Sequence, residues 1–149
     1  SIRVTDYQPV FADPSYYCGP GPALIVGDDG KMTVCFRRVL SWLTEGFASH
    51  WHPATETCLT HSTDAGRHWT DPTTFLAGHQ CPNLRRLSSG VWLHHTHRFE
   101  LVTDAIEKQI VDRTGGSLSK GWWPGIQRGT SVHLSKDQGA HVSHGTTQE

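Results

Sequence analysis

The chain contains no apolar run that approaches the ~20 residues a membrane-spanning helix requires. It also lacks an excess of charge of either sign: 13 Lys and Arg oppose 14 Asp and Glu, for a formal net charge of −1. A nucleic-acid-binding surface usually carries a basic excess, so we predict neither a nucleic-acid nor a membrane partner. No secretory signal is recognisable, but the chain starts without methionine, which leaves localisation open between secreted and cytoplasmic.

Paired cysteine motifs are missing too. The four cysteines are widely spaced and none forms C-x-x-C, which argues against a cysteine zinc site or a dithiol redox motif. An even number permits two disulfides, and free buried thiols are equally compatible with a chain of this length. The sequence leaves both alternatives open for Cys18, Cys35, Cys58 and Cys81.

Long helical periodicity is scarce, whereas 15 glycines and 8 prolines interrupt the chain. Between them lie short runs with strand character, and Asp-Asp-Gly at 28–30 and Ser-Ser-Gly at 88–90 are typical turns between two such runs. One weakly periodic stretch, 102–111, predicts a short helix. The pattern predicts an all-β protein, with strands at residues 23–26, 31–38, 57–62, 74–77, 82–87, 91–99 and 130–134.

An internal repeat organises these strands. The motif S-x-D-x-G-x-x-W begins at Ser62, and a second copy begins at Ser135 with valine in place of the tryptophan. Each unit reads strand, turn, strand, loop, strand, motif, strand. The second unit is expected to stop just after its motif and to carry residues 100–129 as an insertion between its second and third strands.

The motif describes a turn that satisfies its own polar groups. The Asp64 carboxylate can accept hydrogen bonds from backbone N–H groups two and three residues on, and Gly66 supplies backbone freedom. Ser62 can tie the incoming strand to the turn, and Trp69 is expected to start the outgoing strand and to be buried between sheets. Because a catalytic acid is not usually duplicated along a repeat, we interpret both copies as structural: Ser62, Asp64, Gly66 and Trp69, with Ser135, Asp137 and Gly139.

This motif resembles the Asp box, or BNR repeat, of the sialidase (neuraminidase) superfamily, and the resemblance covers most of the chain. It implies a six-bladed β-propeller whose blades are antiparallel four-stranded sheets. Residues 20–78 would form one blade and residues 81–149 part of a second. In that family the boxes lie between the third and fourth strands, on the rim opposite the ligand face.

The sequence departs from the family at its catalytic positions. Where the resemblance places an Arg-Ile-Pro motif that grips the sialate carboxylate, Pro20 stands at the arginine position and Pro22 at the proline. Proline cannot replace a bidentate guanidinium. The loop 41–55, expected to hold the family's acid/base aspartate, contains only the carboxylate of Glu45. The nucleophilic tyrosine belongs to later blades, whereas Tyr7, Tyr16 and Tyr17 all precede the first.

The loops 41–55 and 100–129, joined by the connection 78–81, are expected to share the ligand face. Indoles stack on the apolar faces of sugar rings, and imidazole or guanidinium groups bond hydroxyls or an acidic group. The alternative is that the tryptophans seal a blade edge or an interface. The predicted ligand-binding residues are Trp42, His50, Trp51, His52, His79, Trp122, Trp123 and Arg128.

Eleven histidines raise the question of a metal. His95 and His97 lie two residues apart on a predicted strand, so they face one side and are weak zinc candidates, while His94 points the other way. No third ligand at a fixed position is evident, and we predict no metal or other cofactor. Arg37 and Arg38 end a strand, where one of them either binds an anion in the channel or is simply solvated.

Three functions remain open. The leading one is carbohydrate recognition by a module that is catalytically incomplete as a single chain. The second is a glycoside hydrolase with Glu45 or Asp104 as its acid, and the third is a structural or interaction protein. A six-bladed ring needs about 250 residues or more, so the chain is a propeller fragment, a homo-oligomer such as three chains of two blades, or a sandwich-like rearrangement.

Overall fold

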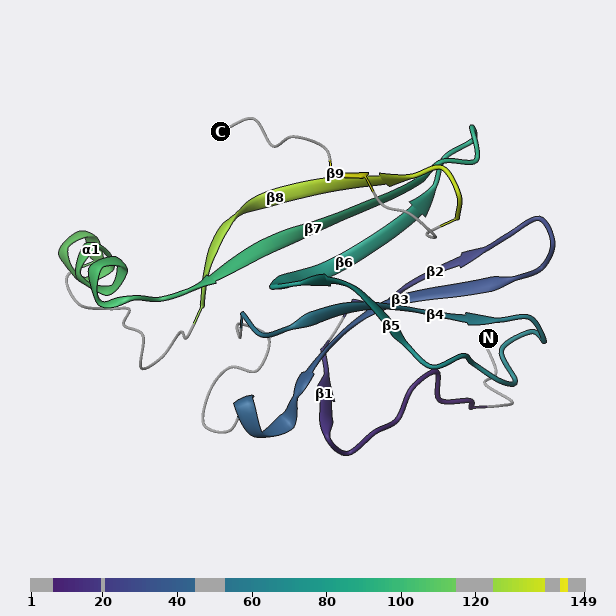
Figure 1. The fold of residues 1–149 in the computed structure, drawn as a ribbon, viewed down its shortest axis with the longest axis horizontal. Coiled ribbons are helices and arrows are strands. Elements are labelled where there is room, and N and C mark those ends of the chain that lie inside the picture. The colour runs from purple at the N-terminus through teal and green to yellow at the C-terminus, as the bar shows by residue number, and fades with distance from the viewer. Residues whose placement is uncertain (1–6, 20, 45–52, 115–124, 139–142, 145–149) are drawn as a thin grey trace, which may run out of the picture.

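The computed structural model describes residues 7–19, 21–44, 53–114, 125–138 and 143–144, which form two antiparallel sheets stacked face to face (Figure 1). The predicted all-β class is confirmed. The first sheet contains β1 (Tyr16–Cys18), β2 (Ala23–Val26), β3 (Met32–Leu40), β4 (Glu56–Ser62) and β5 (Thr73–Ala77). The second sheet contains β6 (His79–Arg86), β7 (Trp92–Leu101), β8 (Gly125–Ser135) and β9 (Ser143–His144).

In the first sheet β1 and β2 pair with different parts of the same long strand. Tyr17 lies opposite Val39, and Leu24 lies opposite Val34, both on β3. The sheet then continues through β4 to β5. The sequence prediction missed β1, because a three-residue strand is too short to show alternation.

The second sheet is a simple meander from β6 to β9. Here the expectation that the second unit ends after its box is wrong, since β9 supplies a fourth strand with the pairs His133–His144 and Leu134–Ser143. The start of β8 was also misplaced. It pairs with β7 from Gly125 onward, across a register shift near Gly129, and glycines inside a strand read as breakers in sequence.

The predicted helix is confirmed with shifted ends, as α1 (Asp104–Thr114). Thr103 precedes it, and its hydroxyl accepts the N–H of Ile106 at 3.4 Å, a capping contact that explains the later start. Within the described part of the chain, no helix combines the length and the apolar character needed to cross a membrane.

The core lies between the sheets, where the two-residue period of the strands brings apolar side chains to the facing sides. The first sheet contributes Ile25, Cys35 and Leu59, and the second contributes Leu84 and Trp92. A separate core covers the outer face of the first sheet. It consists of Val34, Phe36 and Cys58, with Val10, Phe11 and Trp69 packed against them.

All four cysteines are free thiols, which decides between the two alternatives that the sequence left open. Cys18 and Cys81 are exposed, whereas Cys35 and Cys58 are fully buried. The buried pair lies on opposite faces of the first sheet, Cys35 toward the second sheet and Cys58 in the outer core. Burial raises the pKa of both buried thiols, so neither is reactive in the folded protein.

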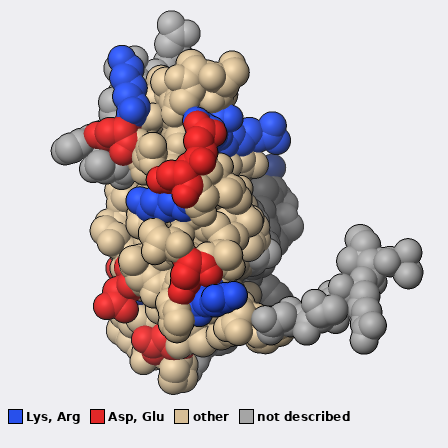
Figure 2. All heavy atoms as spheres, turned by 90° about the vertical axis from the view of Figure 1, so that its right-hand side faces the viewer, with Lys and Arg blue, Asp and Glu red and all other residues tan. Residues whose placement is uncertain are grey.

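The stack has two distinct ends (Figure 1). The box end carries the turns β2–β3, β4–β5 and β6–β7, and there Arg86 forms an ion pair with Asp28 that links the two sheets. Figure 2, which views the molecule from this side, shows basic and acidic side chains interspersed. The connection end carries the 3₁₀ helix η1 (Ser41–Thr44) and α1, where each sheet's long connection begins.

Candidate functional site

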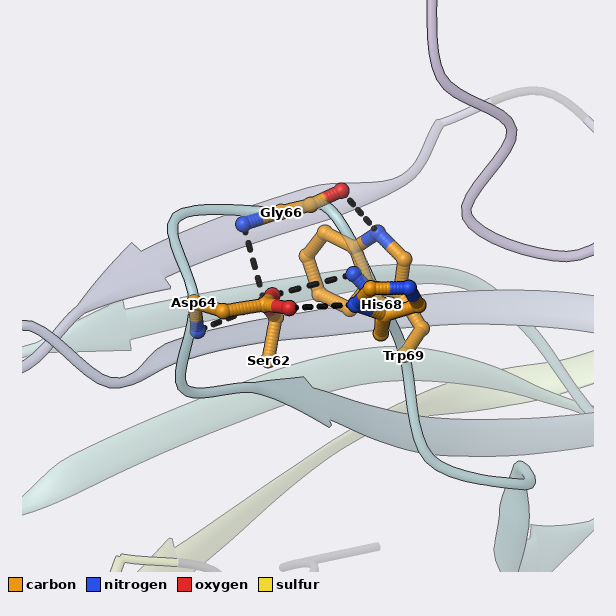
Figure 3. A network of polar contacts seen from close by, with 5 residues as sticks. All are labelled: Ser62, Asp64, Gly66, His68 and Trp69. Atoms are coloured by element: carbon orange, nitrogen blue, oxygen red, sulfur yellow. Dashed lines mark hydrogen bonds and ion pairs between the residues drawn. The ribbon is translucent and has the colours of Figure 1, made fainter.

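The turn of the first S-x-D-x-G-x-x-W motif, called the first box below, is organised by a buried hydroxyl (Figure 3). Ser62, the last residue of β4, donates its Oγ–H to Asp64 Oδ1 at 2.9 Å. Ser62 Oγ also accepts the backbone N–H of Gly66 at 2.9 Å and that of Asp64 at 3.4 Å. Ala65 and Gly66 both have positive φ, 60° and 86°, so the chain reverses within two residues and glycine relieves only part of the strain.

Asp64 accepts the backbone N–H of His68 at 2.9 Å, and its second oxygen lies 2.5 Å from His68 Nδ1 (Figure 3). These contacts, the backbone amide first, hold the pKa of the Asp64 carboxyl far below its ordinary value. The backbone donor lies four residues on, not two or three as expected, and the amide two residues on, that of Gly66, donates to Ser62 Oγ instead. A general acid needs a raised pKa instead. The Asp64 carboxylate is therefore suited to holding the turn in its ionised form and not to donating a proton.

Trp69 is held differently from the sequence expectation. Its Nε1–H donates to the carbonyl of Gly66 at 3.0 Å, and its ring packs on the outer core beside Val34 and Phe36. It is therefore not buried between the sheets, and it precedes β5 rather than starting it. The expectation failed because strand alternation defines two faces without telling which of them meets the other sheet.

The described part of the second box, residues 135–138, shares two features with the first. Ser135 donates to Asp137 Oδ1 at 2.8 Å, as Ser62 does to Asp64. Gln138, with φ of 57°, holds the place that Ala65 holds in the first turn. Gly139 lies outside the described residues.

The connection end holds those predicted ligand residues that the structure describes. Trp42 in η1 is 67% exposed. Arg128 on β8 is exposed and donates from Nε to Glu100 on β7 at 3.2 Å. His79 is half-buried and turns inward, with Nδ1 2.7 Å from the carbonyl of Ala77. Outside the described residues lie His50, Trp51, His52, Trp122, Trp123 and the candidate acid Glu45.

Asp104, the other candidate acid, is the exposed first residue of α1. A carboxylate in the first helical turn is stabilised by the exposed backbone N–H groups there. The stabilisation of α1 therefore explains an aspartate at this position without a catalytic role. Glu100, close by in the chain, contacts Arg98 and Arg128, each at 3.2 Å.

A hollow of about 440 Å³ opens beside the beginnings of β2 and β6, lined by both weak metal candidates, His95 and His97. Asn83 lies opposite His95 in register, and Cys81 sits in a bulge with φ of 52°. The sequence reading missed both, although a cysteine followed by proline inside a strand signals such a bulge. Within the described ranges no three His, Cys, Asp or Glu side chains can hold a metal ion together. The polar side chains that line the hollow, Asn83, His95 and His97, are hydrogen-bonding groups.

Neither arginine at the end of β3 is simply solvated. Arg38 pairs with Glu56 at 2.9 Å and lies 4.4 Å above the ring of Tyr16. Arg37 is buried and donates to Thr55 Oγ1 at 3.4 Å. Its guanidinium fills the space beside Gly19, where a Cβ would lie 1.7 Å from Nη2. Both side chains therefore pack on the first sheet.

Comparison with known proteins gives a fold and no family. No family model matches the chain, and no curated protein matches it. The structure is similar to the crystal structure of a protein of unknown function from Dyadobacter fermentans DSM 18053, with a TM-score of 0.71 and 20% sequence identity. The match covers 91% of this chain and 37% of that chain, so this chain spans little more than a third of the similar protein's length.

Proposed function

We propose that this chain recognises a carbohydrate at its connection end. The observation that carries the proposal is Trp42, whose indole is 67% exposed on the end opposite the Asp-box turns. An exposed indole is not buried against apolar side chains of its own protein. It offers a flat surface on which the apolar face of a pyranose can stack.

Polar groups for the sugar hydroxyls come from the same half of the molecule. The hollow beside β2 and β6 presents the half-buried imidazoles of His95 and His97 with the amide of Asn83. Arg128 is exposed and its pair with Glu100 is at the surface, where an ion pair contributes little stability. Its guanidinium can therefore exchange Glu100 for an acidic sugar at little cost.

We further propose that the two sheets are neighbouring blades of a larger propeller. Both outer faces leave apolar side chains partly exposed: Leu24 and Val26 on the first sheet, Val132 and Leu134 on the second. The part of this chain that matches the similar protein, 91% of a chain with two sheets, corresponds to 37% of that protein's length. At this ratio the full length of the similar protein would accommodate about five such sheets, which is within the range of ordinary propellers. Additional sheets, or copies of this chain, would cover these faces.

The test is titration calorimetry with sugars selected on a glycan array. Trp42→Ala is expected to weaken binding about tenfold or more, the loss of roughly 1.4 kcal/mol of stacking. Trp42→Phe should retain most of the affinity because it keeps a ring.

Leu24→Ala is the matched control, since it removes an exposed apolar side chain from β2. Its affinity should equal that of the wild type. The proposal fails if no sugar binds the wild type, or if Trp42→Ala and Leu24→Ala bind equally well.

A further inference from the structure

Three imidazoles lie together on the face of the second sheet that packs against the first. His94 on β7 and His133 on β8 are directly opposite in register, so both project from the same face. Their ring centroids are 5.7 Å apart, and His79 on β6 lies 5.8 Å from His133. A histidine cluster inside an interface between sheets is unusual, because that face is ordinarily apolar.

Two members of this cluster are buried, since His94 and His133 are each 3% exposed. The ring of His94 meets the ring of Phe75 on β5 edge-on, with centroids 4.9 Å apart. Among the described residues neither Nδ1 nor Nε2 has a hydrogen-bond partner. A neutral imidazole tolerates this at moderate cost, whereas an imidazolium would bury a charge and two unsatisfied N–H donors.

Among the described residues around His94, none is a carboxylate that could pair with a protonated imidazole. The first sheet presents Leu59 from β4 and Phe75 from β5, and Cys35 from β3 lies in the same core. The titratable groups that act on His94 are His133 from β8, His79 from β6 and His95 from its own strand, all of them imidazoles and none of them a carboxylate. Burial, reinforced by these neighbours, lowers the pKa of His94 to about 3.

We propose that this histidine cluster makes the contact between the two sheets acid-labile, so that proton uptake by His94 separates the second sheet from the first. The separated form exposes the imidazole to water, where its ordinary pKa of 6.5 applies. The contact is therefore at full strength above pH 6.5 and weakens as the pH falls from 6.5 toward 3. If the separated form binds one proton at His94, lowering the pH from 7.5 to 5 increases the population of the separated form about thirtyfold.

The two buried cysteines report this separation selectively. Cys35 lies between the sheets, whereas Cys58 lies under the outer core of the same sheet. We would label the full chain with 4,4′-dithiodipyridine, which reacts with thiols in acid, and quantify each cysteine by peptide mass spectrometry. Rates are divided by that of glutathione at the same pH. Cys35 labelling should accelerate about thirtyfold at pH 5 with little change at Cys58.

Two variants assign the effect to its residue. His94→Leu should make Cys35 labelling nearly independent of pH, while His97→Leu, on the opposite face of the same strand, should keep the thirtyfold rise. A pH-independent Cys35 in the wild type overturns the proposal, as does an equal rise at Cys58, which would indicate global unfolding. The wild-type comparison decides by itself if His94→Leu fails to fold.

Discussion

Replacing Trp92 with alanine is expected to lower the free energy of unfolding by about 3–5 kcal/mol. Trp92 begins β7, is 4% exposed, and packs with Leu84 of its own sheet against Leu59 of the other. Truncation removes the largest apolar side chain of this core and leaves a void that the two sheets cannot fill without shifting. Urea unfolding at pH 7.5, followed by circular dichroism, measures the change.

Trp42→Ala serves as its matched control, because it deletes the same side chain from a position that is 67% exposed. It should alter stability by no more than about 0.5 kcal/mol. Equal losses for both tryptophans would show that the sheets do not pack through Trp92, and a Trp92→Ala loss below about 1 kcal/mol would show the same.

The second large effect is expected for Ser62→Ala, with a loss of about 1–3 kcal/mol. The hydroxyl is buried, accepts the amides of Asp64 and Gly66, and donates to the Asp64 carboxylate. Alanine leaves these amides without that acceptor in a turn that already holds two residues at positive φ. Hydrogen exchange at Gly66, together with urea unfolding, should reveal the loss.

Thr63→Ala provides the comparison within the same turn, since Thr63 is exposed and adjacent. Its stability should match that of the wild type within about 0.5 kcal/mol. If Ser62→Ala is equally mild, the hydroxyl does not organise the turn. The amide of Gly66 should then exchange at the wild-type rate.

The elements that carry their own local signal could be predicted from sequence. Glycine-containing turns placed the β2–β3 and β6–β7 hairpins, and β2 was found with its observed ends. The serine and aspartate of both boxes make the same contact in the structure because that contact spans only two residues. Alternation along β7 also separated His94 correctly from His95 and His97.

Features that depend on contacts between distant segments could not be predicted. Alternation along β3 gave two faces but did not tell which face Trp69 covers. The histidine pattern of β7 gave no sign that His94 would be buried, because a polar residue in a strand is ordinarily read as solvent-facing. Cys81 and Asn83 entered the candidate site only because a bulge in β6 brings them beside His95.

The most direct test of the account concerns its central claim, that the box acid builds the turn and does no chemistry. A carbon-detected NMR titration of the Asp64 carboxyl group gives its pKa in the folded protein. We predict a midpoint well below the ordinary value of 3.8, because the His68 amide and the Ser62 hydroxyl stabilise the carboxylate. A midpoint at or above 3.8 would contradict the account, because an acid that keeps its proton is suited to catalysis.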